Sequence, residues 1–392
     1  MLALEVSISP GYRHMSYSRR EQLKWFAKAG LTLGAAPLLK GCDFSLRRDA
    51  NAGPTNIVPL PAAPTPWPTR DPFLFCVHHL DHYPEGNGKV GPKVSLDRRQ
   101  LGRDFAGIDG WNMYHGREVP GFPKHPHRGF ETITMVEQGF VDHTDSLGAK
   151  ARYGAGDVQW LTAGKGIQHA EMFPLLNTDQ KNPLELFQIW LNLPRASKFS
   201  TPHFSMFWNR QIPIISGVDH NGHGFEMKLI AGQYGDTRAL KPPPSSWAVR
   251  HQSDFALATL TLSPRSRFKL PPTRPDTRRS LYFYRGESLQ VGPQLVAVKH
   301  RIDLDHSLPI VLHNGEKTTK LLLAQSQAIG EPIARRGPFV MNEPYELTQA
   351  FRDYRKNQFG GWEWPHEAPT HGPAPTRFAQ YKDGKIEKPP AG

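Results

Sequence analysis

Hydrophobic positions along this chain repeat with the period of β-strands much more often than with that of helices. Apolar and polar residues alternate over 132–135 and 158–161, and again over 227–231 and 260–262. Glycine and proline, with 35 and 37 residues, together make up about 18% of the chain, against an average nearer 12%. Short alternating strands separated by such turn residues predict an all-β protein.

The strand-like pattern occurs in two blocks, which predicts two tandem barrels. The segment 281–286 parallels the strand that ends at Gly139, and the pattern restarts near Ile212. At 392 residues the chain is long enough for two such domains. We expect one domain over 71–210 and the other over 211–341.

One helix is expected after the barrels, within a C-terminal segment over 342–392. Leu347, Ala350, Phe351 and Tyr354 follow the spacing i, i+3, i+4, i+7. Asn342 is expected to cap the helix start, and Gly360 with Gly361 to stop it. The remainder, 362–392, is rich in proline and is expected to form an arm lying on the surface.

Residues 1–41 are typical of an export signal. Arg19-Arg20 precede a mildly apolar run over 25–39, which is too short and, with Lys28, too polar to span a bilayer comfortably. This looks like a twin-arginine signal, for which Met15 offers a later start. We expect export to the periplasm or cell envelope, which a twin-lysine variant would test. The alternative is an amphipathic N-terminal helix of a cytoplasmic protein.

The segment after the signal, 42–70, is rich in proline and is expected to be a tether. The run from Leu39 to Cys42 resembles a lipoprotein processing site, so Cys42 is a candidate for lipidation and membrane attachment. Only one other cysteine, Cys76, is present, and no disulfide framework is expected.

The formal net charge is +12, of which the leader contributes four. Lys and Arg are otherwise scattered and form no basic groove interleaved with aromatic residues. A solvated basic surface is favoured, and no nucleic-acid partner is expected.

Two clusters of metal-type ligands carry the chemistry, His125-Pro126-His127 and His169-Ala170-Glu171. Residues i and i+2 of a strand point to the same face. Two such strands, facing each other across a barrel, would gather three imidazoles and one carboxylate around one divalent ion, for which Fe, Mn, Ni, Cu and Zn are suitable. With 18 histidines in the chain, one His-x-His can arise by chance, but the second cluster favours a site.

Other histidines have weaker claims. His78, His79 and His82, with Asp81, can form a second site or a lid, although a surface loop or packing histidines are favoured. His143 can orient a substrate, although packing is again favoured. Counted back from Gly286, the positions equivalent to the first histidine pair hold Arg274 and Pro272, so the second barrel is expected to lack ligands.

The sequence around the ligands resembles a known family. His-Pro-His-Arg-Gly-Phe-Glu-Thr at 125–132 and the segment over 156–172, which ends Gln-His-Ala-Glu-Met, are similar to the pirins, a branch of the cupin superfamily, over roughly 70–360. The resemblance implies two tandem jelly-roll cupin barrels and a metal held by His125, His127, His169 and Glu171. It also implies that Glu131, where many cupins place a ligand, is not one here.

For function, the resemblance implies a quercetin 2,3-dioxygenase-type oxidoreductase that uses Fe(II), O2 and a small aromatic, flavonol-like substrate. No P-loop, dinucleotide fingerprint or serine-nucleophile motif competes with this reading. A positive, open metal site binds an acidic enol or phenol, and Glu171 can act as the catalytic base. The alternative is a non-enzymatic, iron- or redox-responsive binding protein of the cell envelope, or a transcription cofactor if the chain is not exported.

Overall fold

The computed structural model describes residues 53–62 and 65–391. The predicted twin-arginine signal and the lipidation site at Cys42 lie outside these residues. No helix in the described part of the chain is long and apolar enough to cross a membrane.

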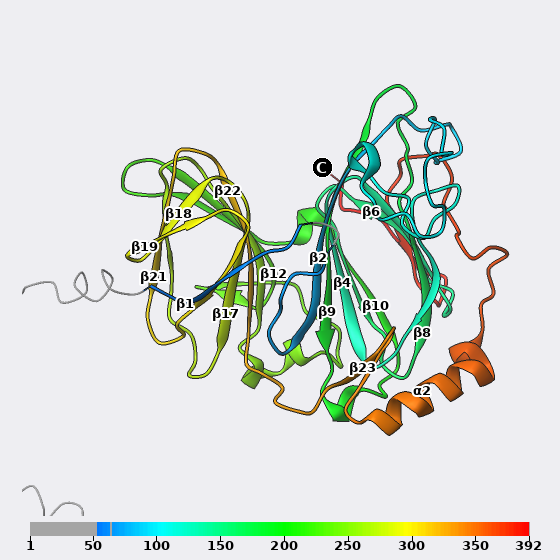
Figure 1. The fold of residues 1–392 in the computed structure, drawn as a ribbon. Helices are drawn as coiled ribbons and strands as arrows, with labels where there is room; N and C mark the ends of the chain where they lie inside the picture. The colour runs from blue at the N-terminus through cyan, green and yellow to red at the C-terminus, as the bar shows by residue number, and fades with distance from the viewer. Residues whose placement is uncertain (1–52, 63–64, 392) are drawn as a thin grey trace, which may run out of the picture. The chain divides into compact units, whose positions relative to one another are not determined.

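The first barrel is formed by two antiparallel sheets (Figure 1). One has five strands in the order β10-β7-β4-β9-β2: His203–Phe207, Val158–Thr162, Phe130–Gln138, Asn182–Asn192 and Phe73–Tyr83. The other has six strands in the order β26-β25-β6-β5-β8-β3: Ile386–Glu387, Phe378–Gln380, Lys150–Gly154, Phe140–Asp145, Ile167–Met172 and Gly121–His127.

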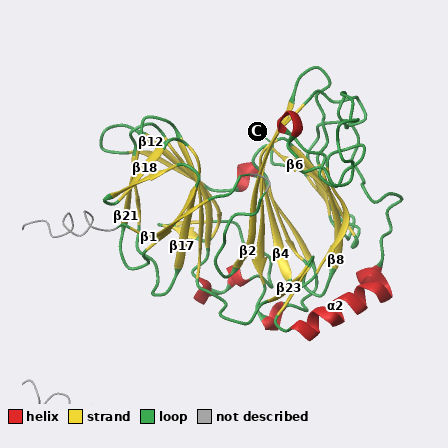
Figure 2. Cartoon of the chain, in the orientation of Figure 1, coloured by secondary structure: helices red, strands yellow, loops and turns green. Residues whose placement is uncertain are grey.

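The second barrel has the same two-sheet architecture. Its seven-stranded sheet has the order β1-β20-β17-β22-β15-β12-β11: Pro54–Pro59, His300–Leu304, Arg278–Arg285, Thr319–Ser326, Ala256–Leu262, Gly224–Ala231 and Ile214–Val218. Its four-stranded sheet has the order β16-β21-β18-β19: Arg267–Leu270, Ile310–Asn314, Ser288–Val291 and Gln294–Ala297. Two short ribbons, β13-β14 (Gln233–Tyr234, Thr237–Arg238) and β23-β24 (Ala334–Arg336, Phe339–Met341), complete the described strands. The prediction of two tandem cupin barrels followed by a short helix is confirmed (Figure 2).

The five-stranded sheet is the wall that the two barrels share. Along β4, Ile133 and Met135 belong to a buried cluster with Tyr282 and Leu322 of the second barrel. Thr134, between them, points the other way and contacts residues inside the first barrel. This side-chain alternation gives the strand two buried faces, so one sheet serves both cores.

Part of the predicted tether belongs to the second barrel. Residues 54–59 form β1, which pairs with β20 at the edge of the seven-stranded sheet. Pro54 and Pro59 stand at the two ends of this edge strand, where a missing backbone N–H is tolerated.

The C-terminal helix α2 spans Pro344–Asn357, and its cap differs from the prediction. Glu343 is the N-cap, in a capping box with Glu346, whose carboxylate accepts from the Glu343 N–H at 2.8 Å. Asn342 was the wrong choice because its amide instead donates to Glu331 and Pro332. The helix also ends before the predicted glycines, at a left-handed Gln358.

The C-terminal arm is built into the first barrel instead of simply lying on it. β25 pairs with β6 and β26 pairs with β25, so the arm supplies two of the six strands of this sheet. The Ala379 side chain is fully buried there. Arg152, paired with Asp142, also donates to the carbonyls of Gly372 and Ala374.

Candidate metal centre

The two ligand clusters lie on neighbouring strands of one sheet. β3 pairs antiparallel with β8, and His125 stands directly opposite His169. The prediction that these strands face each other across the barrel is therefore wrong. Directly paired residues of an antiparallel ladder point to the same face with Cβ atoms about 5 Å apart, so a hydrogen-bonded pair of strands brings the histidines together equally well.

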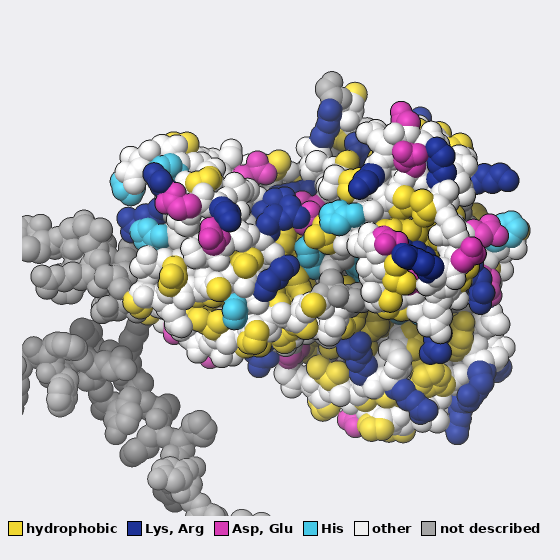
Figure 3. Space-filling model, turned by 45° about the horizontal axis from the view of Figure 1, so that its top comes forward, with side chains coloured by type: hydrophobic (Ala, Val, Ile, Leu, Met, Phe, Trp, Pro, Cys, Tyr) yellow, Lys and Arg dark blue, Asp and Glu magenta, His cyan; other side chains and the backbone are white. Residues whose placement is uncertain are grey.

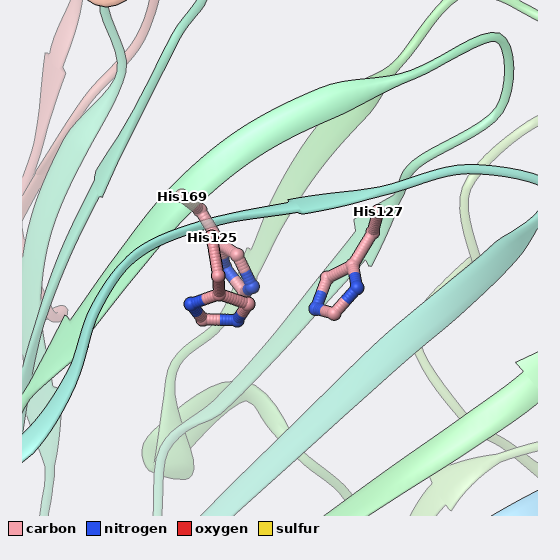
Figure 4. Close-up of side chains that lie close together, drawn as sticks. All are labelled: His125, His127 and His169. Atoms are coloured by element: carbon pink, nitrogen blue, oxygen red, sulfur yellow. The ribbon is translucent and has the colours of Figure 1, made fainter. Parts of the chain in front are cut away.

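Three imidazoles converge from this pair of strands (Figure 4). Ligand nitrogens of His125, His127 and His169 all lie within 4.8 Å of one another. Their ring centroids are 4.4 to 4.9 Å apart. Such a group can hold a single ion.

The free nitrogens of these histidines fit a metal. Both ring nitrogens of His169 and Nδ1 of His127 are buried without a hydrogen-bond partner in the described structure. His125 Nδ1 lies 2.9 Å from the Pro123 carbonyl, so this nitrogen carries the hydrogen and Nε2 keeps its lone pair. Buried polar atoms without a partner are costly, and a cation bound by the lone pairs would remove that cost.

Burial also keeps these imidazoles unprotonated. It lowers the pKa of His125 to about 4 and holds the pKa values of His127 and His169 well below the usual range. A metal needs the neutral, lone-pair form of the ring, and that form dominates at neutral pH.

Glu171 lies beside the three histidines and is held from the opposite sheet. Its Oε2 is 3.8 Å from His169 Nε2. Thr134 on β4 donates to Oε1 at 2.9 Å, and the Gln188 amide on β9 donates to Oε2 at 3.2 Å. Burial raises the pKa of Glu171, while Thr134 and Gln188 oppose that rise. The carboxylate is thus fixed at the edge of the imidazole group.

The other sequence candidates do not belong to the group of three converging imidazoles. Glu131 is on the opposite face of β4 from Thr134 and accepts from Thr162 and Ser246, away from the histidines. His143 is buried on β5, directly opposite Glu171, with its ring stacked on Phe204 and 5.6 Å from the ring of His169. It is a neighbour of the site but is not among the residues that line the cavity.

The histidine cluster on β2 is split between the two faces of the shared sheet. His78 pairs with Glu185 between the barrels, Nε2 to Oε1 3.0 Å. His79 lies on the other face and lines the first barrel's cavity. Neither belongs to the three-histidine group.

Sequence reasoning missed the residues that complete the site. Thr134 and Gln188 are ordinary inward positions of β4 and β9, and only the pairing of these strands brings them to Glu171. The alternation of Thr132 and Thr134 with apolar residues was the one available signal. Nothing in the sequence indicated that arm residues 364–371 would line the cavity.

A cavity of about 1200 Å³ opens onto His125 and His127. Its walls include Phe75, Phe122, Phe173 and Trp190, together with Thr134, Gln188 and Glu171. Figure 3 shows hydrophobic, basic and histidine side chains interspersed on one face of the molecule. A mostly apolar and aromatic cavity with a few convergent polar groups is typical of a small-molecule site.

Comparison with known proteins agrees with this architecture. Residues 94–191 match the sequence profile of the pirin family, and residues 257–360 match the pirin C-terminal cupin domain. A Pseudomonas aeruginosa protein provisionally named quercetin 2,3-dioxygenase is 35% identical over 242 residues, which cover 61% of this chain and 79% of that protein. The chain belongs to the pirin family.

Other pirins and solved structures support the same fold. Pirin-1 of Arabidopsis thaliana is 34% identical over 246 residues, 61% of this chain and 78% of that protein. A crystal structure of quercetin 2,3-dioxygenase from Acinetobacter baumannii superposes with a TM-score of 0.63 at 24% identity, covering 80% of this chain and 99% of that one. At that identity the structural match shows the fold alone.

Proposed function

We propose that this pirin is a metal-dependent dioxygenase that cleaves flavonol-like aromatics with O2. The observation that carries the proposal is the group of three neutral imidazoles, two buried and one half-buried, beside a fixed carboxylate at the wall of an aromatic cavity. The relative provisionally named quercetin 2,3-dioxygenase supports the choice of substrate class.

His125, His127 and His169 would hold a divalent transition metal, with Glu171 as a further ligand or as a base. When bound, an Fe(II) ion would supply the Lewis acidity and redox chemistry that cleavage of the aromatic substrate by O2 needs. Softness and geometry alone also allow Mn, Ni, Cu or Zn at such a site.

Glu171 is placed to take the proton of a substrate hydroxyl. Thr134 and Gln188 hold both carboxylate oxygens, so the group is oriented before substrate enters. Phe122, Phe173 and Trp190 offer apolar surface to the rings of an aromatic molecule and exclude water from the proton transfer.

Oxygen consumption tests the proposal. Iron-loaded protein should consume O2 when quercetin is added, measured with an oxygen electrode. Glu171→Gln should reduce the rate by roughly 100-fold or more, the contribution typical of a general base, and should retain part of the iron because the amide oxygen can still coordinate.

The control is Glu363→Gln, an exposed carboxylate outside the cavity that should leave the rate unchanged. If iron-loaded protein takes up no oxygen with quercetin, the dioxygenase proposal fails. An iron-responsive binding protein then becomes the better account of the same site.

A further inference from the structure

His79 lines the cavity but has no part in holding the metal. It lies on β2, where alternation places Phe75, Val77 and His79 on the cavity side and Cys76 and His78 on the side of the second barrel. The His79 side chain is buried, with ring contacts to Phe122 and Phe173, both of which line the cavity.

A chain of hydrogen bonds from His79 through Tyr114 to Asp81, called the relay below, fixes the tautomer of His79. The Tyr114 hydroxyl donates to Asp81 Oδ2 at 2.8 Å. That hydroxyl has one hydrogen, so the contact of 2.7 Å between Tyr114 Oη and His79 Nδ1 requires the imidazole to donate. His79 therefore carries its hydrogen on Nδ1 and a lone pair on Nε2.

Asp81 is held as the acceptor at the far end of the relay. Its Oδ1 accepts from the Asn112 backbone N–H at 2.9 Å and from the Asn112 amide at 3.2 Å. Burial raises the pKa of Asp81 to about 6, so the carboxyl is mostly ionised at pH 7.5 and keeps accepting from Tyr114.

His79 remains neutral over the same pH range. Burial among aromatic rings lowers its pKa to about 3. The hydrogen bond of the ring is made by Nδ1, and no described residue donates to Nε2. The cavity wall thus presents a buried, oriented acceptor to which no described residue donates.

We propose that His79 Nε2 accepts a hydrogen bond from a hydroxyl of the bound aromatic, distinct from the hydroxyl that Glu171 deprotonates. The preferred substrate is then a polyhydroxylated aromatic. This inference rests on the proposed function and narrows its substrate class.

The hydrogen bond to His79 Nε2 can select between aromatic ligands by whether they carry a second hydroxyl. A ligand without the second hydroxyl leaves a buried acceptor unpaired, and such groups discriminate strongly against analogues that lack the matching donor. From the cost of one unpaired buried acceptor, the preference should be roughly 5- to 100-fold in affinity.

Two flavonols with different numbers of hydroxyl groups can test the hydrogen bond to His79. 3-Hydroxyflavone carries only one hydroxyl, whereas quercetin carries several. Dissociation constants for both can be measured at pH 7.5 by quenching of tryptophan fluorescence, since Trp190 lines the cavity. Quercetin should bind roughly 5- to 100-fold more tightly to the wild-type protein.

The His79→Phe variant keeps a ring but removes the acceptor, so it should lose most of that preference while binding 3-hydroxyflavone as before. His313→Phe is the control, because His313 is an exposed histidine of the second barrel and does not line the cavity. It should keep the preference. A merely structural role of His79 would weaken both flavonols equally and would overturn the inference.

The tautomer is tested without any variant. In 15N-histidine-labelled protein, NMR should show Nε2 of His79 as the unprotonated nitrogen, and Tyr114→Phe should disturb that signal. A protonated Nε2 would overturn the relay. Hydroxyl-dependent binding without oxygen uptake would instead reject only the dioxygenase proposal, and failure of both flavonols to bind would reject both.

Discussion

His127 is the residue at which the metal assignment is most directly tested. Its Nδ1 is buried without a partner, and its ring lies against His169 and Trp190. A variant without this ring loses one of the three imidazoles that would bind the metal. It also loses a buried nitrogen that has no hydrogen-bond partner. The cost to the metal-free fold should therefore be small, because a cavity is left but a desolvated polar group is removed.

We expect His127→Ala to weaken iron binding by more than the roughly 10- to 100-fold that loss of an outer-shell partner costs. Competition with a chromophoric chelator measures this. Thermal unfolding gives the second readout, because saturating metal should raise the melting temperature of the wild type and not that of the variant. His313→Ala, an exposed histidine of the second barrel, should behave as wild type. Equal iron affinity in both variants would refute the ligand assignment.

The convergence of His125, His127 and His169 could be predicted from sequence, because it depends on the local spacing of residues along a strand. Side chains two residues apart on a strand point to the same face of the sheet. This holds whichever strands pair with one another. The partners of Glu171 were not predictable, since Thr134 and Gln188 reach it only after β4 and β9 have paired and the two sheets have closed. The role of His79 was hidden for the same reason, because Tyr114 and Asp81 meet it only in the folded chain.

At the scale of elements, the C-terminal segment braces the ligand strands from outside. Gln168, next to His169 on β8, donates to the carbonyls of Gln358 and Gly361 at 2.8 Å each and accepts from the Tyr354 hydroxyl. On β3, the Lys124 N–H donates to the Glu367 carbonyl, and the two side chains form an ion pair at 2.8 Å.

β3 needs such support because its own ladder is weak. It is the edge strand of its sheet, its register shifts between Phe122 and His125, and Pro123 and Pro126 lack N–H donors. The outer contacts hold Lys124 and Gln168 in place, and thereby restrict the neighbouring His125 and His169.

We therefore expect Gln168→Leu to weaken iron affinity roughly 10-fold and Tyr354→Phe to weaken it less, since the first loses three hydrogen bonds and the second one. Chelator competition is again the measurement. Tyr345→Phe is the matched control on the same helix, because the Tyr345 side chain is 69% exposed. An unchanged affinity in Gln168→Leu would show that the brace has no influence on the site.

Among the elements, sequence periodicity found the strands and the helix face, but not their ends or partners. The N-cap is Glu343, one residue later than predicted, because Pro344 and Glu346 make Glu343 the better cap. The strand order, in which β3 and β8 are neighbours, depends on long-range pairing that no local pattern encodes.

At the scale of the whole molecule, the wall shared by the barrels contains a buried carboxyl. Glu131 is fully buried and accepts from Thr162 of the first barrel at 2.7 Å and from Ser246, in the segment leading to β15, at 2.6 Å. Burial raises its pKa from 4.5 to about 7. The folded protein therefore keeps a proton that the unfolded chain releases above pH 4.5.

Because the folded-state pKa is raised, this group's contribution to stability is complete below pH 4.5 and is lost as pH rises through 7. The loss should reach about 3 kcal/mol at most, from the shift of the pKa. In Glu131→Gln this component should disappear, so urea unfolding of metal-free protein at pH 5 and pH 8 should show a smaller difference than in wild type. Glu363→Gln should retain the wild-type difference. If the difference in unfolding free energy between pH 5 and pH 8 is as large in Glu131→Gln as in the wild type, Glu131 titrates normally.

The path of the chain between the barrels has a consequence for synthesis. β1 joins the second barrel before β2 opens the first, and the strands that complete the first barrel's six-stranded sheet, β25 and β26, come from residues 378–387. A chain emerging from the ribosome makes the strands β3 and β8 early. It cannot finish their sheet, or form the contacts of Gln168 with Gln358 and Gly361, until residues 358–387 have been made. An ion bound before residues 358–387 have left the ribosome would therefore meet the three histidines without their supports, and full affinity would develop only once this segment has folded onto the first barrel.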